Sequence, residues 1–115
     1  MKIALDMDGT FTVDPMFWSV FIVTCLNAGH DIRIVTLREE GVDAIDEYDR
    51  TLQYEIPVIY CNGLAKREQA AKQGFEPDIW IDDDPYAIIK GSSINEDELQ
   101  AWRNSGRKAE GFVYK

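Results

Sequence analysis

The chain has 115 residues, which is enough for one compact domain and too few for two. It carries 12 Lys and Arg against 21 Asp and Glu, a formal net charge of −9, which excludes a basic nucleic-acid-binding surface and a binder of anionic membranes. An anionic substrate would therefore need positive charge from elsewhere, most simply from a metal ion. Because 45% of the residues are hydrophobic and 29% are charged, the composition is that of a globular chain.

The cysteines and the apolar runs predict a soluble protein of the cytoplasm. Cys25 and Cys61 form neither a CxxC pair nor a disulfide framework, so free thiols are expected. The N-terminal run reaches Asp6 after three apolar residues, which predicts no signal peptide. The longest apolar stretch, residues 16–26, is shorter than the roughly 20 residues that a membrane-spanning helix needs.

Short apolar runs alternate with helical patterns along the chain. We predict strands at residues 2–5, 31–35, 57–61 and 78–81, with 111–115 as either an edge strand or a loose tail. The first predicted helix begins at Asp14-Pro15 and ends at 27–29. Further helices are predicted at 39–52, at 64–73, and from a capping box at 93–96 to the neighbourhood of Gly106.

This alternation predicts the α/β class. We expect a single doubly wound, Rossmann-like domain over residues 1–115, with a mainly parallel sheet of four to five strands and helices on both faces. Residues 2–90 would form the core, and residues 92–115 would form a C-terminal helix and tail. In such sheets a binding site lies beyond the carboxyl ends of the strands, where the strand order reverses.

Polar residues follow every predicted core strand at that edge. They are Asp6 and Asp8 after the first strand, Thr36 after the second, the turn from Gly63 to Lys66 after the third, and Asp82, Asp83 and Asp84 after the fourth. Fold stability gives no reason to gather so many carboxylates, because they repel one another. A divalent cation would remove the repulsion, so the sequence predicts a metal site.

Four short motifs occupy these strand ends. They are Asp6-Met7-Asp8-Gly9-Thr10, then Ile34-Val35-Thr36, then a Lys that opens the helix before the last core strand, and finally Trp80-Ile81-Asp82-Asp83. The first matches the DxDGT motif of the haloacid dehalogenase (HAD) superfamily of phosphotransferases, and the others resemble its second, third and fourth motifs. The resemblance spans residues 2–85, and four motifs in register are far more specific than a lone DxDG.

The resemblance implies catalysis through an aspartyl-phosphate. Asp6 would attack phosphorus and carry the phosphoryl group, while Asp8 would protonate the leaving oxygen and then deprotonate the attacking water. Thr36 would hold a phosphoryl oxygen, and Lys66 would neutralise the nucleophile and the transferring group. Lys66 is preferred to Lys72 because Lys72 lies about 9 Å further along its helix, away from the strand ends.

Mg²⁺ is the cofactor that the resemblance implies, and it suits an oxygen-rich site. The ligands would be the Asp6 carboxylate, the Asp8 backbone carbonyl, Asp82 and waters. Asp83 would complete the metal site as a partner for a bound water or for Lys66.

Gly9, Thr10 and Arg38 form the expected substrate-binding set. Gly9 permits the tight turn that folds Asp8 back over the site. Arg38 completes a Thr-x-Arg pattern that resembles nucleotide and polynucleotide-end phosphatases of the superfamily. A solvated cation at a helix start is an equal alternative for Arg38.

The expected function is Mg²⁺-dependent hydrolysis of phosphate monoesters, since the resemblance implies that dehalogenases lack the second acid, Asp8. Residues 11–13 and 37–56 leave no room for a cap domain, so an open site is expected. It would accept a small phosphorylated molecule or a nucleic-acid end, or borrow a cap from a neighbouring subunit. A nucleotide or polynucleotide-end phosphatase is the enzymatic alternative, and a catalytically silent Mg²⁺-binding relative is the non-enzymatic one.

Two further features keep alternatives open. Cys61 and Arg67 satisfy the C-x5-R pattern of cysteine-dependent phosphatases, although that chemistry leaves the acidic cluster unexplained. The helix that runs from Met16 to Leu26 is apolar nearly all round. It is either buried between the sheet and the C-terminal segment or part of a homo-oligomer interface.

Overall fold

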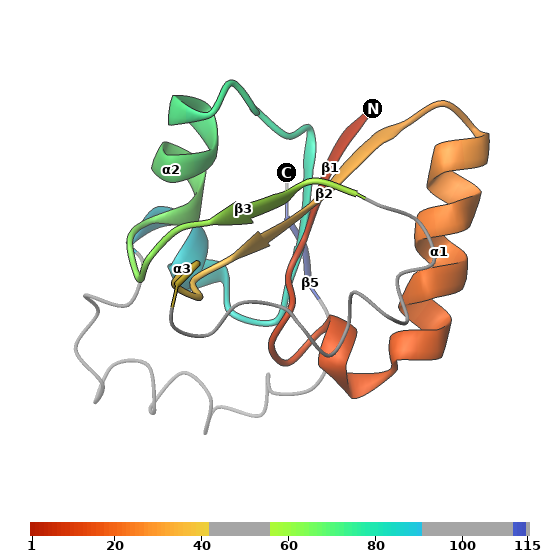
Figure 1. The fold of residues 1–115 in the computed structure, drawn as a ribbon, viewed down its shortest axis with the longest axis horizontal. Helices are drawn as coiled ribbons and strands as arrows, with labels where there is room; N and C mark the ends of the chain where they lie inside the picture. The colour runs from red at the N-terminus through yellow and green to blue at the C-terminus, as the bar shows by residue number, and fades with distance from the viewer. Residues whose placement is uncertain (42–55, 91–111, 115) are drawn as a thin grey trace.

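The structure is a computed structural model that describes residues 1–41 and 56–90 and the backbone of 112–114. In chain order its elements are β1 (Lys2–Leu5), the short helix η1 (Phe11–Val13), α1 (Pro15–Asn27), β2 (Asp31–Thr36), β3 (Val58–Tyr60), α2 (Lys66–Lys72), β4 (Ile79–Asp82), α3 (Pro85–Ile89) and β5 (Phe112–Tyr114). The strands form one sheet in the order β3-β2-β1-β4-β5 (Figure 1). The first four are parallel, and β5 runs antiparallel to β4.

The helices cover both faces of the sheet because successive residues of a strand point to opposite sides. Ile3 and Leu5 of β1 pack on the same side as Ile22 and Cys25 of α1. Ala4, between them, joins the cluster on the opposite side, which includes side chains of α2 and α3. In Figure 1 α1 accordingly lies on one side of the sheet, and α2 and α3 lie on the other. The α/β class and the parallel sheet are as predicted.

Helix α1 begins and ends where the sequence predicts. The Asp14 side chain accepts a hydrogen bond from the Phe17 amide at 3.2 Å, and Pro15 occupies the first helical position. The chain leaves the helix through Gly29, whose φ of +83° is a conformation that glycine adopts readily. Met16 and other apolar side chains on the outer side of α1 stay exposed to solvent among the described residues.

The predicted strands are confirmed to within a residue or so at each end, and residues 112–114 form the edge strand rather than a loose tail. Two helix predictions differ from the structure. Helix α2 begins at Lys66 instead of residue 64, and α3 was not predicted, because Asp84-Pro85 was interpreted as a stop after β4. The same Asp-Pro pair starts α1, so proline at the first helical position explains both helix starts.

Parts of two predicted helices lie outside the described residues. Residues 39–41 are not helical, and the rest of the helix predicted at 39–52 is outside the description, as is the helix expected after the capping box at 93–96. Between β1 and α1 the chain contains only η1 and short turns, so no domain is inserted there. Within the described residues, every helix is too short or too polar to cross a bilayer.

The strand connections run in opposite directions on the two sides of β1. From β1 the chain passes through α1 to β2 on one side, whereas from β3 it passes through α2 to β4 on the other side of β1. The direction of strand addition therefore reverses between β1 and β4. In open α/β sheets, ligands bind beyond the strand ends at such a point.

Candidate active site

The carboxyl ends of β1 and β4 carry a buried group of charged side chains. Asp6 directly follows β1, Asp82 ends β4, and Lys66 opens α2 on the loop that follows β3. All three are buried, which is unusual for charged residues unless they are paired. The structure thus brings together residues that are far apart in the sequence and that the motifs singled out.

Lys66 lies between two carboxylates. Its Nζ donates to Asp6 Oδ1 at 2.7 Å and to Asp82 Oδ2 at 2.5 Å. Burial by itself lowers the pKa of Lys66, but attraction to the two carboxylates outweighs burial and raises it, so the ammonium stays charged. Lys72 is 63% exposed and pairs with Glu68 at 3.7 Å, away from the cluster. The geometry therefore brings Lys66, and not Lys72, to the acidic cluster.

Three carboxylates compete for this one ammonium. Oxygen atoms of Asp6, Asp82 and Asp83 lie within 4.8 Å of one another. Burial raises the pKa of Asp82 to about 7 against the attraction of Lys66, and repulsion from Asp6 adds to the rise. Burial likewise raises the pKa of Asp83 to about 8, together with a hydrogen bond and repulsion from Asp6. An excess of negative charge thus remains after the lysine is counted.

The donor set fits a hard divalent cation. Mg²⁺ prefers carboxylate oxygens and needs only one or two of them together with water molecules. Asp6, Asp82 and Asp83 would supply carboxylate ligands, and the cation would remove the repulsion that raises their pKa values.

Thr10 and Gly9 shape the loop after β1 around this cluster. The Thr10 hydroxyl donates to Asp6 Oδ2 at 3.1 Å, so the two Asp6 oxygens have different partners, Thr10 and Lys66. Gly9 has a φ of +84°, and a Cβ there would lie 2.3 Å from Asp83 Oδ2. Sequence reasoning assigned Gly9 and Thr10 to substrate binding. In the structure Thr10 orients Asp6, and Gly9 leaves space for Asp83.

Asp8 is the one motif carboxylate that does not belong to the group formed by Asp6, Asp82 and Asp83. It is 58% exposed and receives a two-pronged interaction from Arg38, with Nε at 2.9 Å and Nη2 at 2.6 Å from its oxygens. The hydrogen bond from Arg38 holds the pKa of Asp8 below its usual range. The DxDGT motif placed Asp8 at this edge, and the Thr-x-Arg pattern placed Arg38 two residues after Thr36, but nothing in the sequence indicated that Asp8 and Arg38 pair.

Arg38 is fixed by its backbone as well. Its amide donates to Thr36 Oγ1 at 3.2 Å, and its carbonyl accepts from the Asn62 amide at 3.2 Å. Thr36 is buried at the end of β2, beside the end of β1. Its hydroxyl therefore helps to position the arginine, a contact that sequence reasoning missed.

The rival cysteine loop lacks the features of a reactive thiol. Cys61 is completely buried, and burial raises the pKa of its thiol to about 11. Reactive cysteines have lowered pKa values and are partly accessible. Arg67, which would bind the phosphate in that chemistry, is exposed on α2. Cys61 thus lacks the environment that its role in the C-x5-R pattern needs.

Comparisons of the chain with protein-family models, with curated proteins and with solved structures find no match. Geometry and motif pattern are therefore the basis for the functional inference.

Proposed function

We propose that this protein is a Mg²⁺-dependent phosphate monoester hydrolase of the HAD type, built on a doubly wound, Rossmann-like domain. One observation carries the proposal: a buried Lys66 joins Asp6 and Asp82, with Asp83 alongside, at the point where the strand order reverses. A fold has no need of two buried carboxylates and a half-buried third around one ammonium, whereas phosphoryl transfer needs a nucleophile and concentrated positive charge.

The residues support a two-step displacement at phosphorus. In the first step an Asp6 oxygen forms a bond to phosphorus, the bond from phosphorus to the leaving oxygen breaks, and Asp8 supplies that oxygen with a proton. In the second step water attacks phosphorus, Asp8 accepts its proton, and the Asp6–phosphorus bond breaks to release inorganic phosphate. Lys66 stays charged throughout and offsets the charge on Asp6 and on the transferring group.

The remaining residues orient these groups. The Thr10 hydrogen bond fixes the rotation of the Asp6 carboxylate. The Thr36 hydroxyl, which accepts from the Arg38 amide, would donate its own proton to a phosphoryl oxygen. Mg²⁺ held by the Asp6, Asp82 and Asp83 carboxylates and the Asp8 carbonyl would supply the charge that screens the nucleophile from an anionic substrate.

Hydrolysis of an aryl phosphate such as p-nitrophenyl phosphate tests the proposal. We expect turnover by the wild type with Mg²⁺, and none with EDTA or in Asp6→Asn, which keeps the shape of the side chain and removes its charge. Cys61→Ala should retain turnover, because its thiol is buried and protonated. Activity that survives EDTA and Asp6→Asn but disappears in Cys61→Ala would contradict the proposal and move the chemistry to the cysteine loop.

A nucleotide or polynucleotide end is the second candidate substrate class. Two features favour it. Arg38 supplies positive charge for a phosphate, and the short connection between β1 and α1 leaves room for a large substrate. The net charge of −9 opposes tight binding to a nucleic acid chain, since phosphate contacts need Lys and Arg. A screen of nucleoside monophosphates against short 3′-phosphorylated and 5′-phosphorylated oligonucleotides separates these classes.

A further inference from the structure

Both oxygens of the Asp8 carboxylate are engaged by Arg38. The guanidinium binds them side by side at 2.9 and 2.6 Å, the planar two-pronged geometry in which Arg–carboxylate pairs are strongest. Asp8 is also absent from the group of carboxylates that converge around Asp6 among the described residues. While the pair is closed, Arg38 occupies both Asp8 oxygens, so neither is free to exchange a proton with a substrate bound at Asp6.

Hydrogen bonds hold the backbone of Arg38 in place, and its side chain is less exposed than that of Asp8. The Arg38 backbone is tied to Thr36 on one side and to Asn62 on the other, and its side chain is 19% exposed. The Asp8 side chain is 58% exposed and directly precedes Gly9, whose φ is +84°. If the pair opens, Asp8 is thus the member that moves, and the guanidinium stays at the mouth of the site.

We propose that Arg38 is a positioning residue that retains Asp8 until the phosphoryl group of a substrate takes over the guanidinium and releases the carboxylate. This inference rests on the proposed function. A phosphate monoester dianion carries more charge than a carboxylate, and two of its oxygens can accept the same pair of hydrogen bonds from the guanidinium. It therefore competes well for Arg38. The substrate class that opens the pair is a phosphate monoester. The released carboxylate, no longer held ionised by Arg38, takes up a proton from solvent and passes it to the leaving oxygen.

Steady-state kinetics of Arg38→Gln separates this role from a structural one. Because the variant loses a charge-assisted contact to the phosphoryl group but leaves Asp8 released, KM should rise by about tenfold or more, while kcat should stay within about a factor of two. We expect the raised KM and the nearly unchanged kcat both for p-nitrophenyl phosphate and for glycerol 2-phosphate, whose alkoxide needs a proton to leave. A fall in kcat with KM unchanged would overturn the proposal.

Three further variants serve as references. Arg38→Lys keeps the charge without the fork and should give an intermediate KM. Asp8→Asn should lose kcat much more on glycerol 2-phosphate than on the aryl ester, because the aryl leaving group departs without a proton. Arg33→Gln removes a similar two-pronged Arg–Asp pair, to Asp31, at the other end of the sheet, and should leave both constants unchanged.

A measurement that needs no turnover separates this inference from the proposed function. The Nε–H resonance of Arg38 reports its partner in nitrogen-15 NMR spectra. We expect it to shift when inorganic phosphate is added with Mg²⁺, and to be shifted already in Asp8→Asn. An unchanged resonance in Asp8→Asn would show that the pair does not form, and would overturn the proposal even if the enzyme is active. If no monoester is hydrolysed, the proposed function fails and the release loses its catalytic role.

Discussion

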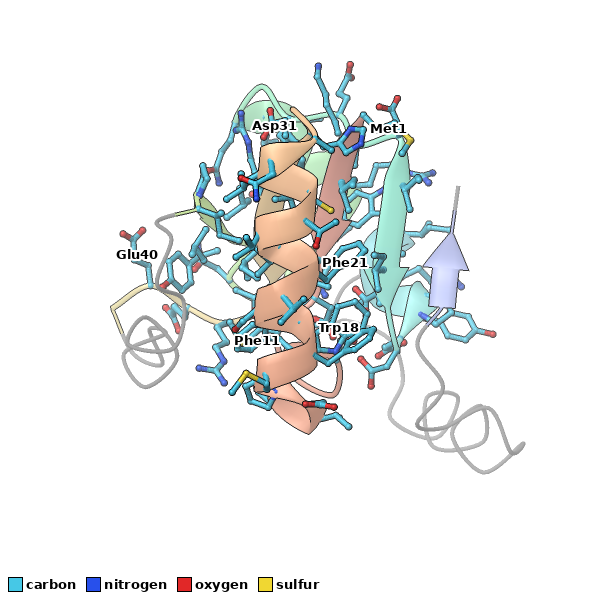
Figure 2. The ribbon with its side chains drawn as sticks, turned by 90° about the vertical axis from the view of Figure 1, so that its right-hand side faces the viewer. Met1, Phe11, Trp18, Phe21, Asp31 and Glu40 are labelled. Carbon is cyan, nitrogen blue, oxygen red and sulfur yellow. The ribbon has the colours of Figure 1, made fainter. Side chains whose placement is uncertain are left out.

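The two ends of the parallel sheet both carry charged residues, but only one end buries them. At the amino end, Asp31 pairs with Arg33 while staying 41% exposed, and Asp78 accepts from the Lys2 amide at the surface. At the carboxyl end, the charged side chains of Lys66 and its partners are shielded from water. Figure 2 shows this axis of the molecule, with Met1 and Asp31 near one end and Phe11 and Trp18 near the other.

The difference separates what the fold needs from what a site needs. Partly exposed pairs such as Arg33–Asp31 contribute little to stability, and they also cost little to form. Burying an ion costs several kcal/mol of solvation, and one ammonium cannot fully offset that cost for the two buried carboxylates and the half-buried Asp83. The carboxyl end therefore has lower stability than an apolar interior would give, and this is the expected sign of a functional site.

The largest expected effect is on catalysis at the carboxyl end. Asp6→Asn should reduce turnover of p-nitrophenyl phosphate by on the order of 10³-fold or more, because the amide cannot attack phosphorus. Asp31→Asn makes the same chemical change at the amino end and should leave kcat and KM as they are. Equal losses in the two variants would mean that the two ends do not differ in function.

The next effect is on folding. Lys66→Met should lower the free energy of unfolding of the metal-free protein by about 3–5 kcal/mol, because it leaves buried carboxylates without their counter-charge. Lys72→Met, in the same helix but exposed, should change it by less than about 0.5 kcal/mol. Urea denaturation measures both values. If Lys66→Met is as stable as the wild type, the buried pairs are not present in solution.

A smaller effect is expected at the turn that faces Asp83. Gly9→Ala places a methyl group against the Asp83 carboxylate and should weaken Mg²⁺ binding as well as stability. Gly29→Ala has a nearly identical φ of +83° with open space around it, so it should show only the backbone strain of about 1–2 kcal/mol. Calorimetric titration with Mg²⁺ distinguishes the variants, and unaltered binding in Gly9→Ala would argue against Asp83 as a ligand.

The last effect is the pH dependence of stability, which needs no substitution. The folded protein raises the pKa of Asp82 to about 7 and that of Asp83 to about 8, so it holds their protons more tightly than the unfolded chain does. The free energy of unfolding of the metal-free protein should therefore fall as pH rises from about 4 to about 8. The lowered pKa of Asp8 has the opposite effect: it makes the free energy of unfolding rise with pH, and it does so below this pH range.

Mg²⁺ should flatten that dependence, because a bound cation favours the charged carboxylates. Urea midpoints measured at about pH 5 and about pH 8.5, with EDTA and with Mg²⁺, give the two slopes. Asp83→Asn should also reduce the slope without metal. A stability that rises over this range in EDTA would contradict the excess of negative charge inferred at the site.

Much of the fold could be predicted because its signals are local. The apolar run at 2–5 and the Asp14-Pro15 helix start depend on adjacent residues alone, and both have the predicted boundaries. The same locality explains the error at Asp84-Pro85, since an Asp-Pro pair is compatible with a turn and with a helix start.

The members of the candidate site could be predicted, but not their contacts. Parallel strands bring their carboxyl ends to one edge, so Asp6, Lys66 and Asp82 could be expected near one another. The pairing of Asp8 with Arg38 depends on the conformations of two loops, and the approach of Gly9 to Asp83 depends on a backbone angle. No residue pattern predicts either contact, because each one joins two segments that are far apart in the sequence.

The measurement that tests the central claim most directly is chemical trapping of the intermediate. The wild type would be mixed with p-nitrophenyl phosphate and Mg²⁺, quenched in acid and reduced with borohydride, which converts an aspartyl-phosphate into homoserine. Peptide mass spectrometry should then find homoserine at position 6 and nowhere else, and none when Mg²⁺ is omitted. Turnover with an unmodified Asp6, or modification at another residue, would contradict the assignment of Asp6 as the nucleophile.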